Sequence, residues 1–404
     1  MKRLVSTILW PAILPAPASI CLPDLMRQRT AVCASLIIAL FAPPAVGQTA
    51  YKFVNIADTS GPFSALGSPL QSEWFAGVDI NTSGEVAFIA VLDAGGAGVY
   101  RHSAGRLVTI ADSAGPFSGF TELSLNDAGV VAFTGGLDAK VGGVFTGDGG
   151  IITTIIDTNG PFTAFMGVSI NNAGEVAFGG KLDSTADRGY FKVSGGSITT
   201  IAYIDRPFRD FRAPAINDAG VVAFQGQDYG TGISGIYTGS GGPLSTIVEG
   251  SIDPRPSINN SGLVAFSRYA SAATGSAIYK GDGGSLDLFV SSDGPFKSLF
   301  PCPDINDHRA VVFRATLDGG GLGIYTGVNP ATDKVVEIGD AMFGSTLVRI
   351  YGFPRLNDRG DVVFEYALAS GVRGIAVALV VPEPACGALG LMALAALWLS
   401  RSRA

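Results

Sequence analysis

The sequence predicts an all-β fold, a seven-bladed β-propeller of four-stranded blades. Three observations predict it: a motif that recurs seven times, strand and turn signals inside each copy, and two incomplete ends that complement each other. The composition agrees with this fold. The 404 residues include 55 glycines and only 15% charged residues, which suits short strands and tight turns better than helices.

The repeat is anchored on an aliphatic residue followed by asparagine. Successive anchors are 45, 45, 46, 42, 47 and 51 residues apart. Repeats of about this length that contain four short strands are typical of propeller blades. The seven anchors are Ile80-Asn81, Leu125-Asn126, Ile170-Asn171, Ile216-Asn217, Ile258-Asn259, Ile305-Asn306 and Leu356-Asn357.

Each repeat contains the same order of strand and turn signals. After the anchor, Asn-x-x-Gly predicts a tight turn, as in Asn126 to Gly129. The next run, such as Val130 to Phe133, is apolar on both alternating faces, which predicts a strand covered on both sides. A third strand opens on glycine, as at Gly143, and a fourth resembles Thr153 to Ile156. A connector, Asp-x-x-Gly-Pro-Phe, leads to the next repeat, as in Asp112 to Phe117.

The two ends of the repeat region predict that the ring closes. Tyr51 to Ala57 has the pattern of a fourth strand, whereas the seventh repeat ends after its third strand, near Gly374. The N-terminal strand can therefore complete the last blade and remove the open edge of the sheet. A β-solenoid and two sandwiches are alternatives, but an open stack of hairpins would not need matching ends.

Residues 1–47 are predicted to be a leader for export. The propeller is predicted to cover residues 48–380. Met26-Arg-Gln-Arg29, the apolar run Ala31 to Phe41 and the small residues that follow have the three regions of a secretory signal peptide, with cleavage near Gly47. Met26 is a candidate for the true start. An N-terminal membrane anchor is the alternative, but the apolar run is short for a span.

Residues 381–404 form a distinct tail. Val381-Pro-Glu-Pro384 precedes the uncharged stretch Ala385 to Ser400, which Arg401 and Arg403 follow. This order predicts an extended break, a short transmembrane helix and a cationic end that stays cytoplasmic. The alternative is a helix buried in the core.

The tail closely resembles the PEP-CTERM sorting signal of Gram-negative bacteria. The matching residues are Val381, Pro382, Glu383 and Pro384, then the apolar stretch, then Arg401 and Arg403. The resemblance implies a precursor anchored in the inner membrane, processing by an exosortase, and delivery to the cell surface or the exopolysaccharide matrix. The same tail is sometimes called an ice-binding-protein C-terminal domain, which says nothing about ice here. The repeats also resemble uncharacterised propeller-like repeats of exported bacterial proteins.

Aspartates recur at the predicted ends of strands. The functional hypothesis is a face that binds calcium weakly, or polysaccharide, and the alternative is that each aspartate caps its own turn. Second strands end near Asp93, Asp138, Asp183, Asp228 and Asp318, which an up-down blade places on the same face. The candidate acidic face consists of Asp58, Asp112, Asp157, Asp205, Asp293 and Asp340.

Two further sets of residues are candidates for function. Cys302, Asp304, Asp307 and His308 form the most unusual local cluster, although a buried thiol and repeat drift explain it better than a catalytic Cys–His pair. The second set occupies equivalent positions of the innermost strands and is predicted to line the central channel. It comprises Asp79, Ser124, Ser169, Ala215, Ser257, Asp304 and Arg355.

Several function classes find little support in the sequence. The chain has only two histidines, no phosphate-binding loop and no Gly-x-Ser-x-Gly motif, so we expect no histidine-based metal site and no histidine-based catalysis. We expect no cofactor, apart from the weak calcium binding considered above. A net charge of −7 without a basic cluster argues against nucleic acid. Short, regular loops favour a non-enzymatic surface or matrix protein that presents a propeller for binding or display. A secreted polysaccharide hydrolase or lyase with carboxylates on one face is the alternative, and a purely structural matrix role is a third.

Overall fold

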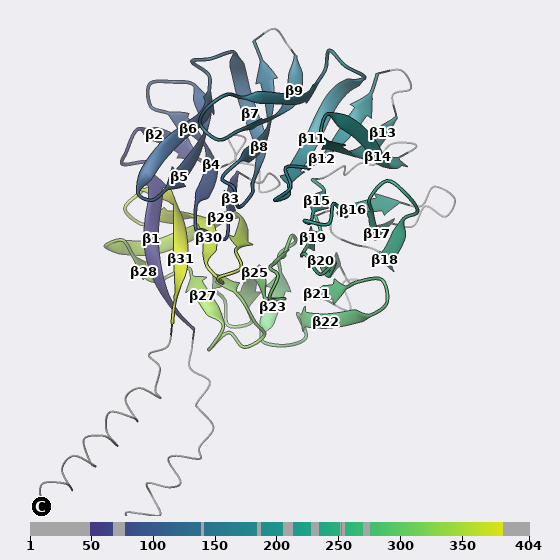
Figure 1. The fold of residues 1–404 in the computed structure, drawn as a ribbon. Helices are drawn as coiled ribbons and strands as arrows, with labels where there is room; N and C mark the ends of the chain where they lie inside the picture. The colour runs from purple at the N-terminus through teal and green to yellow at the C-terminus, as the bar shows by residue number, and fades with distance from the viewer. Residues whose placement is uncertain are drawn as a thin grey trace, which may run out of the picture. The chain divides into compact units, whose positions relative to one another are not determined.

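In the computed structural model, the described part of the chain forms β-strands arranged as seven blades (Figure 1). The structure describes residues 49–67, 77–138, 141–183, 187–204, 213–227, 234–250, 252, 255–269 and 275–382. None of these residues is helical, and none forms a helix that could cross a membrane. The predicted leader and the predicted tail helix lie outside the described residues.

The first three blades follow the chain in order, and the innermost strand comes first in each. Blade 1 comprises β2 (Phe63–Leu66), β3 (Val78–Ile80), β4 (Val86–Leu92), β5 (Ala97–Ser103) and β6 (Arg106–Asp112). Blade 2 comprises β7 (Phe117–Leu125), β8 (Val131–Leu137), β9 (Gly142–Gly147) and β10 (Thr153–Asp157). Blade 3 comprises β11 (Phe162–Ile170), β12 (Val176–Leu182), β13 (Arg188–Ser194) and β14 (Ser197–Ile204).

The next three blades repeat this order. Blade 4 comprises β15 (Ala215–Ile216), β16 (Val222–Gln227), β17 (Ser234–Gly239) and β18 (Ser245–Glu249). Blade 5 comprises β19 (Ser257–Ile258), β20 (Val264–Tyr269), β21 (Ser276–Gly281) and β22 (Leu286–Ser291). Blade 6 comprises β23 (Phe296–Leu299), β24 (Asp304–Ile305), β25 (Val311–Leu317), β26 (Leu322–Tyr325) and β27 (Lys334–Glu337).

The seventh blade combines both ends of the repeat region, as the sequence predicted. It comprises β28 (Ala341–Met342), β29 (Ser345–Leu356), β30 (Val362–Leu368), β31 (Arg373–Val381) and β1 (Ala50–Asp58). Strand β1 pairs antiparallel with β31, from Ala50 opposite Val381 to Asp58 opposite Gly374. The N-terminal strand therefore supplies the fourth strand of the last blade. Strand β31 runs one residue further than residue 380, the predicted end of the propeller.

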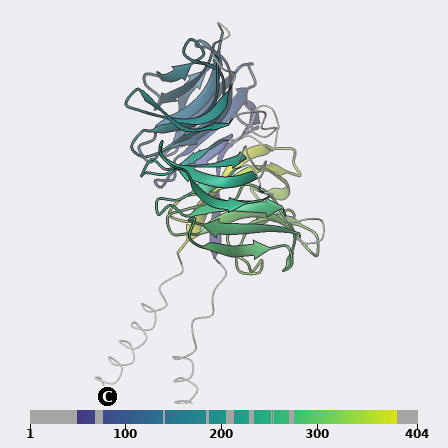
Figure 2. The same cartoon turned by 90° about the vertical axis from the view of Figure 1, so that its right-hand side faces the viewer.

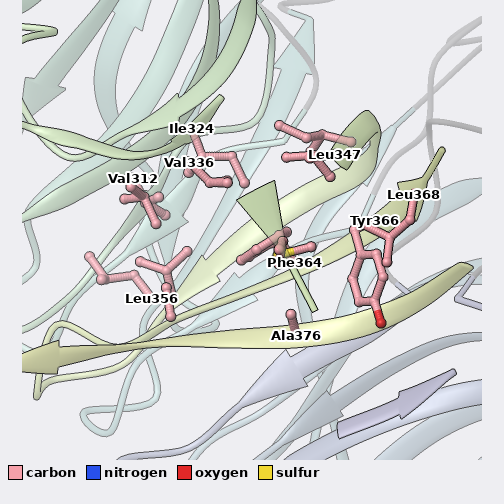
Figure 3. Packing of buried hydrophobic residues seen from close by; sticks show 14 residues of the cluster. Val312, Ile324, Val336, Leu347, Leu356, Phe364, Tyr366, Leu368 and Ala376 are labelled. Atoms are coloured by element: carbon pink, nitrogen blue, oxygen red, sulfur yellow. The ribbon is translucent and has the colours of Figure 1, made fainter. Parts of the chain in front are cut away.

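The core consists of seven apolar clusters, one between each pair of neighbouring blades. Figure 3 shows the cluster between blades 6 and 7, where Val312 and Val336 face Leu347 and Phe364. The second strands are buried on both faces, as the sequence predicted. Figure 2 shows neighbouring blades stacked face against face, and this stacking buries the second strands on both sides.

The glycine at the start of the third strand has a steric reason. At Gly98, an added Cβ would lie 2.7 Å from the Tyr100 hydroxyl, and at Gly143 it would lie 2.7 Å from the Phe145 ring. The aromatic residue two positions later therefore folds back over the glycine. This contact explains why Gly-x-Tyr or Gly-x-Phe recurs in the repeat.

Candidate functional site

The seven anchor asparagines form a closed ring of hydrogen bonds at one end of the channel. Each Nδ2 donates to the backbone carbonyl of the asparagine in the next blade, at 3.0–3.1 Å. The ring closes when Asn357 of blade 7 donates to Asn81 of blade 1. All seven side chains are buried. We call this set the asparagine ring: Asn81, Asn126, Asn171, Asn217, Asn259, Asn306 and Asn357.

Each asparagine of the ring also holds its own turn. In Asn171, Oδ1 accepts the backbone N–H of Glu175 at 2.8 Å, and the equivalent bond occurs in all seven blades. This is the hairpin role that the sequence predicted. The bond to the next blade was not predicted, because the pattern within one repeat contains no sign of a partner in another.

The residues after the asparagines line the mouth of the channel at this end. Asn172 bridges Asp127 and Asp218 through Nδ2, at 3.0 and 3.1 Å, and Asn260 bridges Asp218 and Asp307 at 2.8 Å to each. Asn172 and Asn260 therefore separate the carboxylates by hydrogen-bond donors. The hollow at this mouth has a volume of about 160 Å³.

A second cavity, of about 170 Å³, lies inside the channel. All seven residues that the sequence predicted to line the channel contribute to its wall, so this prediction is confirmed. We call them the channel layer: Asp79, Ser124, Ser169, Ala215, Ser257, Asp304 and Arg355.

Five members of the channel layer also join neighbouring blades. Asp79 accepts the N–H of Leu125 at 2.8 Å, and Ser169 accepts that of Ile216 at 3.2 Å. Ser124, Ser257 and Asp304 do the same toward their following blades. Ala215 has no side-chain acceptor, and Arg355 is a donor. The channel layer is therefore a less regular version of the asparagine ring.

Three charged residues meet on one side of the channel layer. Arg355 Nη1 lies 3.7 Å from Asp304 Oδ1, and Asp79 lies in the adjacent blade. Burial raises the pKa of Asp79 to about 6, since it outweighs Arg355 and the Leu125 N–H, which both lower the pKa. The negative charge of Asp304 raises it further. Asp79 thus changes charge close to neutral pH, in a cavity lined by serines.

A buried ion pair spans the channel two positions before the channel layer in the sequence of each repeat. Arg255 Nη2 lies 2.8 Å from Glu122 Oε1, and the two side chains are 6% and 5% exposed. Arg255 belongs to blade 5 and Glu122 to blade 2, on opposite sides of the ring. Within the described residues, Arg255 Nε and Nη1 and Glu122 Oε2 are buried without a hydrogen-bond partner. These three atoms provide two donors and one acceptor beside the cavity.

The Glu122–Arg255 pair was missed from the sequence, although a signal existed. Both residues lie four positions before the asparagine of their repeat, the position that Gly77, Gly167, Ala213, Cys302 and Phe353 occupy in the other blades. Only Glu122 and Arg255 are charged there. Comparing this position across the repeats would have singled out both residues, although not their contact across the channel.

Three members of the candidate acidic face cap their own connectors. Asp58 Oδ1 accepts the N–H of Ser60 at 2.8 Å, and Asp112 and Asp157 accept equivalent bonds at 3.0 and 2.9 Å. Burial alone would raise the pKa of Asp58, but hydrogen bonds from Ser60 and Asn55 outweigh it and hold the pKa below its ordinary value. These contacts match the turn-capping alternative, and calcium or polysaccharide binding here stays a prediction.

The other members of the acidic face lie in different settings. Strand β22 ends at Ser291, so Asp293 lies in the turn, and the Ser291 Oγ takes the capping position by accepting the Asp293 N–H at 3.4 Å. Strand β27 ends at Glu337, and Asp340 binds Lys334 at 3.0 Å and the Glu337 N–H at 2.8 Å. The prediction that both aspartates end fourth strands was therefore wrong, because Ser291 and Glu337 occupy the strand-end position and the aspartates come two and three residues later. Asp205 lies outside the described residues.

The cluster around Cys302 is divided between two environments. Cys302 and Asp304 line the channel cavity, whereas Asp307 and His308 lie at the exposed turn beyond the asparagine ring. Arg309 occupies the turn position where the other repeats have glycine, with φ of 65°. Among the described residues, no group of three or more His, Cys, Asp and Glu could hold a metal ion.

Most of the predicted sorting motif lies beyond the structure. Val381 is the last residue of β31 and Pro382 follows it. Glu383, Pro384, Arg401 and Arg403 lie outside the described residues. The last described residues therefore show where the tail leaves the propeller, at the end of strand β31.

Comparisons with known proteins support the fold. No protein-family model matches the chain, and no curated protein matches it significantly. The β-propeller domain of the Trilobed protease from Pyrococcus furiosus, described as having an open velcro topology, is 15% identical with a TM-score of 0.52 over 75% of this chain and 95% of that one. In contrast to that description, β1 and β31 close the ring here.

Two further solved structures are similar. Oligogalacturonate lyase from Vibrio parahaemolyticus is 14% identical, with a TM-score of 0.53 over 84% of this chain and 99% of that one. An oligogalacturonate lyase in complex with manganese is 10% identical, with a TM-score of 0.54 over 83% and 99% of the two chains. At such identities the likeness shows the fold alone.

Proposed function

We propose that the chain is an exported, membrane-sorted bacterial surface protein whose propeller binds a sugar unit in its channel cavity. The observation that carries the binding function is the Glu122–Arg255 pair, with three buried polar atoms left without partners beside the cavity. Buried polar groups in proteins are nearly always satisfied, so such a cluster calls for a ligand or ordered water. The sorting function is supported by the tail sequence from Val381 to Arg403.

The chemistry of the cavity suits a polyhydroxylated ligand. A sugar hydroxyl both donates and accepts, so neighbouring hydroxyls can satisfy Arg255 Nε and Nη1 as well as Glu122 Oε2. Ser124, Ser169 and Ser257 add groups of the same kind on the wall. The negative charges of Glu122 and Asp304 balance the positive charges of Arg255 and Arg355. This balance favours a neutral sugar over a strongly charged one.

Glycan binding by the full-length protein, solubilised in detergent, tests this function. We expect selective binding on a glycan array, and weaker binding of the selected sugar by Arg255→Lys, because lysine keeps the charge but loses the planar set of donors. Arg268→Lys is the matched control, since Arg268, on the second strand of blade 5, binds the Glu249 carbonyl of blade 4 and does not line the cavity. Equal binding by both variants, or no selective binding, would contradict the proposal.

A polysaccharide-cleaving activity is the second candidate, and Asp79 is the observation that favours it. A carboxyl group with a pKa of about 6 can exchange protons with a substrate close to neutral pH. We would incubate the protein with each bound glycan and look for new chain ends. If the protein cleaves a glycan and Asp79→Asn abolishes the cleavage, the protein is an enzyme. If the glycans stay intact, the protein binds them without cleaving them.

A further inference from the structure

The loops between third and fourth strands carry most of the exposed apolar side chains. Of the twelve large apolar residues that are exposed in the described chain, seven lie at or next to these hairpins, or at the chain end that replaces the hairpin in blade 7. Their exposed fractions range from 42% to 90%. In blades 1 to 6 the hairpin residues include Leu107, Ile151, Ile198, Leu244, Leu286 and Val328.

The exposed apolar residues at the hairpins lie on one face of the propeller. Every described blade contributes at least one such residue, and blade 7 contributes Val381. Exposed apolar residues scattered singly over a surface need no explanation, but seven that share one face of a ring form a pattern. On the opposite face, Tyr203 at the end of β14 and Phe343 beside β28 are exposed. We call the side with the third-to-fourth hairpins the hairpin face.

Both ends of the described chain leave the propeller at the hairpin face. Ala50 and Val381 are paired at the position where the other blades have their hairpins (Figure 1). The N–H of Thr49 also donates to the carbonyl of Thr332, in the loop of blade 6, at 3.3 Å. The chain end and the neighbouring loop are therefore in direct contact.

The sequence places the apolar tail close to this face. Ala385, the first residue of the uncharged stretch, is four positions after Val381. Four residues span at most about 14 Å even when fully extended. A tail helix inserted in a bilayer therefore keeps the hairpin face near the lipid surface, whatever conformation the connecting residues adopt.

We propose that the hairpin face rests on the lipid bilayer while the tail anchors the protein, with the apolar hairpin residues in contact with the interfacial region. This inference rests on the membrane tether in the proposed function. The occupant is a bilayer because separate loop tips around a ring need a broad surface to touch together. The asparagine ring then faces the membrane, and the Glu122–Arg255 side of the channel faces away from it.

The test places fluorescent probes on both faces of the full-length protein. Cys21, Cys33 and Cys386 are first replaced by serine, whereas Cys302 is buried and stays. Ile151→Cys in blade 2 and Leu286→Cys in blade 5 then carry an environment-sensitive dye on opposite sides of the ring. Tyr203→Cys, on the other face, is the matched control. The labelled proteins are reconstituted into vesicles of phosphatidylethanolamine and phosphatidylglycerol with nitroxide-labelled acyl chains.

The expected result is loss of emission and a blue shift at positions 151 and 286, with no change at position 203. If the protein floats with the vesicles but the dyes at positions 151 and 286 behave like the dye at position 203, the hairpin face does not contact the bilayer. The proposed membrane anchoring by the tail would still hold. Quenching at only one of the two hairpins also overturns contact by the whole face. If the protein does not float, the tether itself fails, and the docking falls with it.

Discussion

The asparagine ring and the channel cavity are built from the same seven strands but differ in regularity. The ring has an identical residue and identical bonds in every blade. The channel layer keeps its inter-blade bond in five blades, and only two residues are charged at the position of Glu122 and Arg255. Uniformity marks the positions that hold the ring together, whereas departures mark the positions available for a ligand.

The largest expected effect is removal of one member of the asparagine ring. Asn171→Ala leaves the carbonyl of Asn217 and the N–H of Glu175 without their buried partners, so we expect a loss of about 3 kcal/mol in the free energy of unfolding. Denaturant unfolding measures it. Asn159→Ala is the control, because Asn159 is exposed and bonds only within its connector. Similar losses for both variants would remove the distinction between the ring and an ordinary turn.

The channel cavity, unlike the ring, should respond to pH. The folded state raises the pKa of Asp79 from 3.8 to about 6, so the folded state binds the proton more tightly than the unfolded one. The stabilisation is complete below about pH 4 and is lost as pH rises through about 6, by about 3 kcal/mol at most. Melting temperatures measured from pH 4 to pH 7.5 test this. In Asp79→Asn the melting temperature should fall less steeply with rising pH. An unchanged slope in that variant would show that another group causes the pH dependence.

Replacing both partners of the buried ion pair should separate stability from binding. In the double variant Glu122→Leu with Arg255→Met, no buried charge is left alone, so we expect the free energy of unfolding to change by less than about 1 kcal/mol or to rise. Glycan binding should be lost. Retained binding in a folded double variant would show that the pair is not the ligand site.

The smallest expected effect is repair of the channel layer at its gap. Ala215→Ser offers the N–H of Ile258 the acceptor that Ser169 offers to Ile216, and we expect a gain of about 0.5–1 kcal/mol. Ala213→Ser, at a position outside this layer, is the comparison. A gain shared by both variants would show that the added hydroxyl, and not the inter-blade bond, is responsible.

The fold could be predicted from the sequence because its signals are local and repeated. The turn after each anchor, the doubly buried second strand and the orphan strand Tyr51 to Ala57 each follow from a few neighbouring residues. The channel layer followed from the repeat alignment once a ring was assumed. The Glu122–Arg255 pair could not be predicted in the same way, because pairing across the ring depends on how seven blades close around the axis.

Two aspartates show the limit of pattern reading within a repeat. Asp112 is the last residue of its strand, whereas Asp293 and Asp340 come two and three residues after their strands end. Neither of these two carboxylates therefore makes the capping bond of Asp112. The identity of a residue near a strand end was not enough to assign its role. The role depended on whether the aspartate was the last residue of its strand or lay in the turn that follows.

The closing blade has a consequence for the order in which the protein can mature. Tyr366 and Asn55, which are hydrogen-bonded across this blade, are 311 residues apart. In the proposed export, a chain that is translocated from its N-terminus exposes β1 first, and β1 must wait for β31, which emerges after every other strand of the propeller. Until then β1 and β30 are open edges that can pair with other chains. Folding should therefore be slow and should depend on translocation of the whole propeller if the chain is exported as proposed, so the unclosed ring is the form that most needs protection by chaperones.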